Sequence, residues 1–139
     1  MENEIKALPL KCEWGEEQVV VRVDSYIVTR GLYIELLHKD GKSYEPFADM
    51  TVCIPEYSLE PNEAFINGDM SREFLQFIKE HSLGKILPYR VRSGFRQYTP
   101  VVFDLDKLQE LDSEGVKRFK QEHDIPNRQP RANKYEQER

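Results

Sequence analysis

The chain has 139 residues and a formal net charge of -5, and 39% of its residues are hydrophobic while 32% are charged. This length suits one domain whose core needs no metal or disulfide, and the apolar content excludes a disordered chain. The longest apolar runs fall far short of the ~20 residues that span a bilayer. The first residues lack the cationic start and apolar run of a signal peptide. We therefore expect a soluble, cytoplasmic protein with no membrane partner.

The cysteine and histidine content argues against a structural metal site. The chain has 2 cysteines and 3 histidines, with no CxxC spacing. A structural zinc site uses closely spaced pairs of such ligands, so we expect no metal, no cofactor and two reduced thiols. Cys53 follows Val52 in an apolar stretch and is interpreted as a small core residue, whereas Cys12, before Trp14, is expected to be exposed.

The first half of the sequence predicts strands. Val19, Val21 and Val23 alternate with other residues, which is typical of a β-strand. Gly residues mark the turns that follow, because glycine adopts positive φ without steric cost. The expected elements are a strand at Gln18–Val28, a turn at Thr29–Gly31, a strand at Leu32–His38, a hairpin turn at Asp40-Gly41 and a strand within Ser43–Ile54 centred on Met50–Ile54.

The second half predicts helices and short strands. Phe74, Leu75 and Ile78 have helical spacing. Asp69 or Ser71 is the expected N-cap of the helix that contains them. We expect an irregular or short extended segment at Glu56–Asn67 with an Asn67-Gly68 turn, and then a helix at Ser71–Ser82 that ends with Gly84 in a left-handed conformation. Strands are expected at Lys85–Arg92 and Tyr98–Asp104. The last expected element is a helix at Asp106–His123, which restarts at Asp112 or Ser113 and is weakened by Gly115.

This order of elements predicts an α+β fold. We expect a small antiparallel or mixed sheet of about five strands with two helices packed on one face. Residues 1–17 are interpreted as an N-terminal lead-in, residues 18–124 as a single α+β domain and residues 125–139 as a disordered tail with two prolines and no apolar periodicity.

Three stretches carry a family resemblance: MTVCIPEYSLEPNEAFIN at Met50–Asn67, EHSLG at Glu80–Gly84 and RSGFRQYTPVVF at Arg92–Phe103. Together they resemble an uncharacterised bacterial family, domain of unknown function 4313, over residues 20–103. The aromatic-proline step of that family departs here, since Thr99 separates Tyr98 from Pro100. The resemblance implies a context in low-GC Gram-positive bacteria and their mobile elements, but no mechanism.

The segment at residues 85–100 is the most unusual in composition. It carries four cations and no acid, interleaved with aromatic residues. Guanidinium groups bind phosphate or carboxylate, and aromatic faces stack on bases. The candidate binding residues are therefore Tyr89, Arg90, Arg92, Arg96 and Tyr98, with Arg90 and Arg92 on one strand face. The alternative is a solvated strand face whose arginines pair with acidic neighbours.

Catalytic signatures are lacking in the sequence. His38, His81 and His123 form no close pair, and positions at helix ends account for His81 and His123. Ser93 in RSGF does not match the nucleophile elbow of hydrolases. We expect a non-enzymatic binding or accessory protein of a bacterial mobile element, with a protein as its partner. A nucleic acid bound by the basic-aromatic segment, an acidic decoy, a small enzyme with an unrecognised site and a homo-oligomer remain alternatives.

Overall fold

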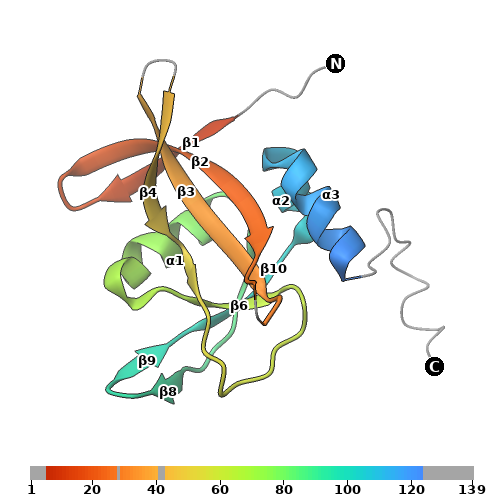
Figure 1. The fold of residues 1–139 in the computed structure, drawn as a ribbon. Coiled ribbons are helices and arrows are strands. Elements are labelled where there is room, and N and C mark those ends of the chain that lie inside the picture. Colours follow the sequence, from red (N-terminus) through yellow and green to blue (C-terminus); the bar gives the residue numbers. More distant parts are fainter. Residues whose placement is uncertain (1–5, 28, 41–42, 124–139) are drawn as a thin grey trace.

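The computed structural model describes residues 6–27, 29–40 and 43–123, and over these it shows two four-stranded antiparallel sheets, a separate hairpin and three α-helices (Figure 1). The strands are β1 (Ala7–Cys12), β2 (Gly15–Ser25), β3 (Leu32–Asp40), β4 (Ser43–Asp49), β5 (Thr51–Val52), β6 (Glu63–Ile66), β7 (Gly84–Ile86), β8 (Val91–Ser93), β9 (Arg96–Tyr98) and β10 (Pro100–Phe103). The helices are α1 (Ser71–Glu80), α2 (Leu105–Leu111) and α3 (Ser113–Glu122), with a 3-10 turn at Gly68–Met70.

The α+β class and the antiparallel pairing are confirmed, while the details of the sheet differ from the prediction. The first sheet has the order β1-β2-β3-β4, the second β5-β6-β10-β7, and β8 pairs only with β9 within the described chain. The single sheet of about five strands is therefore two sheets and a hairpin. The predicted tail at 125–139 and Gly41 of the predicted hairpin turn lie outside the described residues, although Asp40 pairs opposite Ser43.

The first strand lies within the segment that was interpreted as a lead-in. β1 pairs along β2 from Ala7 opposite Val20 to Cys12 opposite Gly15. Its signal is a short alternation in which Leu8, Leu10 and Cys12 pack on the core. The alternation is short and contains Pro9, a residue that argues against a strand.

The predicted strand within Ser43–Ile54 is two strands in two sheets. Met50 is fully buried between them, its N–H donates to the carbonyl of Ile34 at 2.8 Å, and its carbonyl accepts from Asn67 at 2.9 Å. These two bonds join Met50 to both sheets, so the chain passes from the first sheet to the second at this residue. β6 then forms within the segment expected to be irregular or short extended, in agreement with the second alternative.

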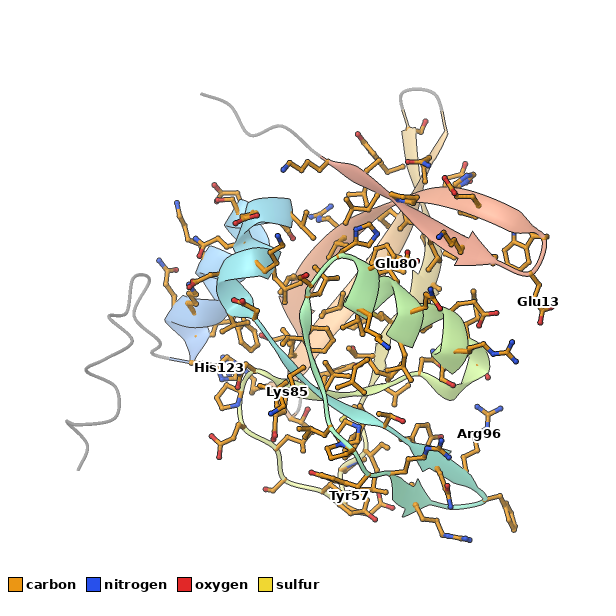
Figure 2. The ribbon with its side chains drawn as sticks, turned by 180° about the vertical axis from the view of Figure 1, so that it is seen from behind. Glu13, Tyr57, Glu80, Lys85, Arg96 and His123 are labelled. Carbon is orange, nitrogen blue, oxygen red and sulfur yellow. The ribbon has the colours of Figure 1, made fainter. Side chains whose placement is uncertain are left out.

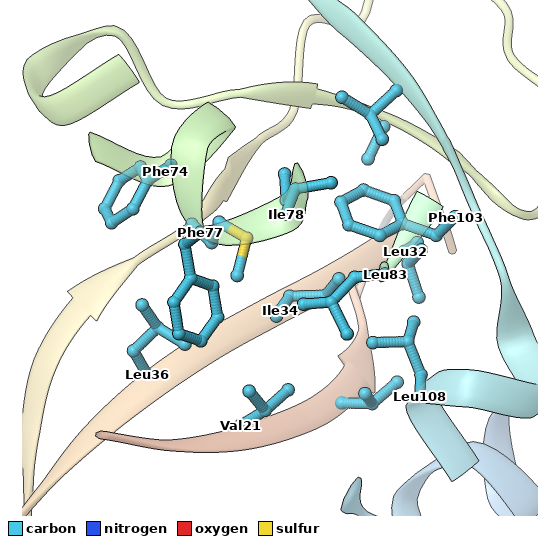
Figure 3. Packing of buried hydrophobic residues seen from close by; sticks show 14 of the residues in the cluster. Val21, Leu32, Ile34, Leu36, Phe74, Phe77, Ile78, Leu83, Phe103 and Leu108 are labelled. Carbon is cyan, nitrogen blue, oxygen red and sulfur yellow. The ribbon is translucent and has the colours of Figure 1, made fainter. Parts of the chain in front are cut away.

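The buried core is built from residues of both sheets and of all three helices, and Figure 3 shows part of it. α1 occupies most of the predicted range and buries Phe74, Phe77 and Ile78. These side chains pack with Ile34 and Leu36 of β3 in the same cluster. The helical period of three to four residues thus places one apolar face of α1 on the sheet.

The ends of α1 differ from the prediction. Neither Asp69 nor Ser71 caps α1; the N-cap residue is Met70 without a side-chain bond, while Asn67 caps the preceding 3-10 turn. Ser82, with φ of 56°, takes the left-handed position expected for Gly84. Gly84 is instead required in β7, because a Cβ there would lie 2.5 Å from the carbonyl oxygen of Val102.

The two strands predicted over residues 85–104 are four shorter ones. β7 ends at Ile86, and Leu87 donates to the carbonyl of Pro100. Pro88 then lacks the N–H that a longer strand would need. β8 and β9 turn back on each other through Gly94, whose φ of 66° suits a two-residue hairpin turn.

α2 and α3 confirm the predicted restart at Asp112 and cover part of β2. β1 pairs with β2 only as far as Val20, which leaves the edge of β2 open beyond that residue. The Asp112 carboxylate accepts from Val23 N at 2.8 Å and from Gly115 N at 3.1 Å. One side chain therefore satisfies the strand edge and caps α3. Within the described residues, every helix falls short of the length and apolar content that a membrane crossing requires.

Candidate binding groove

Three connections lie together at one end of the molecule (Figure 1). They are the turn between β2 and β3, the segment between β5 and β6, and the β8–β9 hairpin. Several large apolar side chains in these connections are exposed to solvent. They are Ile27 (92% exposed), Tyr57 (38%), Leu59 (38%) and Phe95 (104%), and Tyr89 (54%) lies just before the β8–β9 hairpin. Sheets hold the two sides of each connection, so this end presents loops on a fixed scaffold.

A hollow of about 470 Å³ lies between the β2–β3 turn and the β5–β6 segment. Its lining includes the buried residues Leu32, Ile54 and Phe65. The remaining lining residues are Tyr26, Thr29, Arg30, Gly31, Val52, Cys53, Pro55, Tyr57, Ser58, Leu59, Glu60, Pro61, Glu63, Ala64 and His123. A mostly apolar lining with a few polar groups is typical of a site that binds ligands or side chains.

A second hollow of about 480 Å³ adjoins the first. Tyr26, Thr29 and Cys53 line both hollows, and the Thr29 hydroxyl lies 3.5 Å from the Cys53 sulfur. The second hollow is also lined by Asp24, Ser25, Ile27 and Tyr33. We call the two hollows together the loop groove; the three shared residues form the boundary between them.

Two tyrosines hold the β2–β3 side of the loop groove. The Tyr26 hydroxyl lies 3.1 Å from the hydroxyl of Thr51, which is buried and also bonds to the backbone of β3. Burial raises the pKa of Tyr26 to about 12. The Tyr33 hydroxyl donates to Asp49 at 2.8 Å, and burial raises the pKa of Tyr33 as well. Both rings are therefore fixed by bonds to the sheets.

The β5–β6 side is fixed by its own turns and by the hairpin. Tyr57 N donates to the carbonyl of Ile54, and the Glu63 carboxylate accepts from Glu60 N at 3.1 Å. The Tyr57 hydroxyl donates to the carbonyl of Arg92 at 2.8 Å, which ties this segment to β8. A groove whose walls are already bonded loses little further entropy when it binds.

The ionisable groups of the loop groove are mainly acidic. Asp24, Glu60 and Glu63 line it, against one guanidinium, that of Arg30. Arg30 lies 3.9 Å from the Glu122 carboxylate, so an acid already faces that cation. The lining thus favours a positively charged partner over a negatively charged one.

Cys53 is exposed, which corrects its interpretation as a core residue. It lies just after β5, where the chain leaves the second sheet and enters the loop groove. Cys12 is half-buried, and burial raises its pKa. Both thiols are free. Sequence reasoning missed the exposure of the Cys53 thiol, because the apolar residues before it hide the end of the strand.

The first hollow gathers a thiol, an imidazole and carboxylates, which the sequence gave no reason to expect in one place. Among the described residues, the Cys53 thiol has hydrogen-bond contact with Thr29 and with neither His123 nor a carboxylate. A nucleophile needs a base within hydrogen-bond reach. Although these groups line one hollow, no three potential metal ligands among the described residues lie close enough together to hold a metal ion. The arrangement therefore supports binding better than catalysis.

The β8–β9 hairpin divides the candidate residues of the basic-aromatic segment. Arg92 pairs opposite Gln97, and Arg96 pairs opposite Ser93. Because cross-strand partners share a face and successive residues alternate, Arg92 and Arg96 lie on opposite faces. Arg90 precedes β8 and so lies outside the strand. The structure therefore does not bring the three arginines into one patch.

The individual residues of that segment have different surroundings. Arg96 is labelled in Figure 2; its guanidinium lies against the 3-10 turn and pairs with Asp69 at 3.0 Å. This exposed ion pair is of the kind expected for a solvated strand face whose arginines pair with acidic neighbours. Tyr98 is half-buried opposite Val91. Tyr89 and Arg90 are exposed beside the hairpin.

The histidines have structural surroundings. His38 lies in β3 with its ring nitrogen 3.0 Å from Glu17, and His81 at the end of α1 bonds to the carbonyl of Pro9. His123 follows α3, stacks on Phe119 and lines the first hollow. His123 alone of the three therefore reaches the loop groove.

The fold and the groove together define a small α+β protein with a loop-lined groove whose charged lining residues are mainly acidic. Residues 20–123 match the family described as Domain of unknown function (DUF4313), so the chain belongs to that family. The resemblance noted from the sequence is thereby confirmed. No curated protein and no solved structure matches the chain.

Proposed function

We propose that this protein is a non-enzymatic binding protein that holds a segment of a partner protein in the loop groove. The observation that carries the proposal is the pair of adjoining hollows of about 470 and 480 Å³ between two bonded walls. Exposed apolar residues on the rim, among them Ile27 and Leu59, would be covered by such a partner.

The cellular setting is part of the same proposal. The resemblance of residues 20–103 to a bacterial family found on mobile elements supports a role as an accessory protein of such an element. Two free thiols support a reducing, cytoplasmic compartment. The groove binds through shape and charge, and this role uses no cofactor.

Nucleic acid binding is the second candidate, favoured by one observation. Arg90 and Arg92 are exposed, and no carboxylate of the described residues pairs with either. Binding of labelled single-stranded DNA, double-stranded DNA and RNA over a range of salt tests it, because phosphate binding weakens steeply with salt. A double variant, Arg90→Gln with Arg92→Gln, should abolish such binding, whereas Arg96→Gln should leave it intact. Binding that is absent or insensitive to salt contradicts this candidate.

A screen by nuclear magnetic resonance tests the main proposal. The full chain, labelled with ¹⁵N, is titrated with a library of short extended peptides that vary in apolar and charged residues. We expect shifts at amides of the loop groove, such as those of Thr29, Cys53 and Leu59. A substitution of the rim, Ile27→Ser, should weaken the effect, while Trp14→Ser on the distant β1–β2 hairpin should not. Shifts elsewhere only, or none with any peptide, would refute the proposal.

A further inference from the structure

The geometry points to a particular class of partner segment: an extended peptide with two apolar side chains, two residues apart, flanked by Lys or Arg. This inference rests on the proposed function and specifies its ligand.

The shape of the loop groove suits two side chains of one extended segment. Its two hollows have nearly equal volumes of about 470 and 480 Å³ and share the boundary formed by Tyr26, Thr29 and Cys53. In an extended chain, residues i and i+2 point to the same side and lie ~7 Å apart. One apolar side chain of such a pair would enter each hollow, with the backbone crossing the boundary.

The surroundings of each hollow favour apolar side chains. The lining of the first hollow includes the buried residues Leu32 and Phe65. The lining of the second hollow includes Ile27, whose side chain is 92% exposed to solvent. The boundary offers the Thr29 hydroxyl and the Cys53 thiol to a crossing backbone. Burial of the apolar lining supplies affinity, and the boundary groups fix the register.

The charged groups that line the loop groove favour basic flanking residues, because the one guanidinium among them, that of Arg30, already faces Glu122. Asp24 lines the second hollow and Glu60 the first, so each hollow has a carboxylate of its own. Glu56 is exposed next to the first hollow, where its carboxylate accepts from Ser93. A cation on each side of the apolar pair would meet one of these carboxylates. An acidic flank would face the same carboxylates and be repelled.

The experiment compares four labelled peptides of equal length. Three share a core of two leucines separated by one serine, and this core is flanked by lysines, by glutamates or by serines. The fourth keeps the lysine flanks and replaces the leucines of the core with serines. Two readouts are used on the full chain, the amide shifts and the rate at which Cys53 reacts with a thiol reagent in a Cys12→Ala background. The lysine-flanked leucine peptide should bind tightest and slow the reaction of Cys53. Removing either its lysines or its leucines should weaken binding.

Matched variants assign the charge effect to the loop groove. The pair Asp24→Asn with Glu60→Gln should weaken the lysine-flanked leucine peptide about fivefold and leave the serine-flanked one unchanged. The control is Glu13→Gln on the β1–β2 hairpin, a carboxylate that Figure 2 shows away from Tyr57 and His123; it should change neither.

The outcomes separate the two levels of the proposal. Equal binding of the glutamate- and lysine-flanked leucine peptides, with shifts in the loop groove, would overturn the basic class and leave the proposed function standing. Equal binding of the peptide without leucines would overturn the apolar pair. If no peptide shifts groove amides or protects Cys53, both the inference and the proposed function fail.

Discussion

Asp112 joins two parts of the fold through one carboxylate. One oxygen accepts from Val23 N and lies 3.4 Å from Arg22 Nε, while the other accepts from Gly115 N at the start of α3. A polar side chain at a helix N-terminus is a common cap, but the bond to a strand 89 residues earlier is not visible in the sequence.

Replacing Asp112 should therefore lower the free energy of unfolding by more than the loss of a helix cap alone would. Asp112→Ala leaves Val23 N without its acceptor and α3 without its cap, and we expect a loss of about 2–3 kcal/mol in the free energy of unfolding. Urea denaturation measures it. Glu114→Ala, an exposed acid in the same turn, is the control and should change stability by less than about 0.5 kcal/mol. Equal effects of the two substitutions would show that the bond to β2 contributes nothing.

The raised pKa of Tyr26 predicts that the folded protein loses stability at high pH. This pKa is about 12 in the folded protein against 10.0 for the free side chain, chiefly because burial disfavours the phenolate. The unfolded chain therefore releases this proton first, and stability declines as pH rises from about 10 through 12. Tyr26→Phe removes this contribution, so denaturation midpoints of the variant should decline less steeply across that window. An unaltered slope in Tyr26→Phe would contradict the assignment.

At the scale of elements, the strands and helices that could be predicted are those set by a local hydrophobic pattern. The alternation around Val21 and the helical spacing of Phe74 and Ile78 identified β2 and α1, because each element buries one face. The break at Met50 and the division of residues 85–104 were missed, since both depend on bonds to distant strands. The hydrophobic periodicity around a residue can be read from its sequence neighbours, whereas its tertiary contacts cannot.

The loop groove could not be predicted from the sequence for the same reason. The basic-aromatic segment was chosen by composition, yet the register of β8 and β9 separates Arg92 from Arg96. The loop groove is assembled from Tyr26, Cys53 and Phe65, which belong to three different parts of the chain. Only the pairing of the sheets brings them together. Closely spaced prolines at 55 and 61 were the one local signal of a shaped loop there.

The packing of α3 on β2 predicts an unusual effect of a glycine substitution. Alanine normally stabilises a helix by ~1 kcal/mol relative to glycine. At Gly115, however, a Cβ would lie 2.5 Å from the carbonyl oxygen of Val23 and still closer to Asp112. Gly115→Ala should force α3 away from β2 and lower the free energy of unfolding by about 1–2 kcal/mol. An increase in stability, measured by urea denaturation, would mean that the contact is loose.

At the scale of the whole molecule, the question is whether the first sheet extends into a second copy. Its outer strands are β1 and β4, and each pairs with one neighbour within the described residues. An open edge invites pairing between molecules. Pro9 lies in β1 and Pro46 in β4, and each removes a backbone donor from its edge. β4 is further disturbed by a register shift between Leu36 and Leu37 of β3.

We therefore expect a monomer, with both sheet edges protected by proline. Sedimentation velocity over a range of concentrations should show one species of the mass of a single chain. The double variant Pro9→Thr with Pro46→Thr restores both donors in residues that favour strands, so it should add a dimer that grows with concentration. Pro88→Thr, outside the strands, is the matched control and should remain monomeric. A dimer in the unchanged chain, or a double variant that stays monomeric, would show that something other than these prolines governs association.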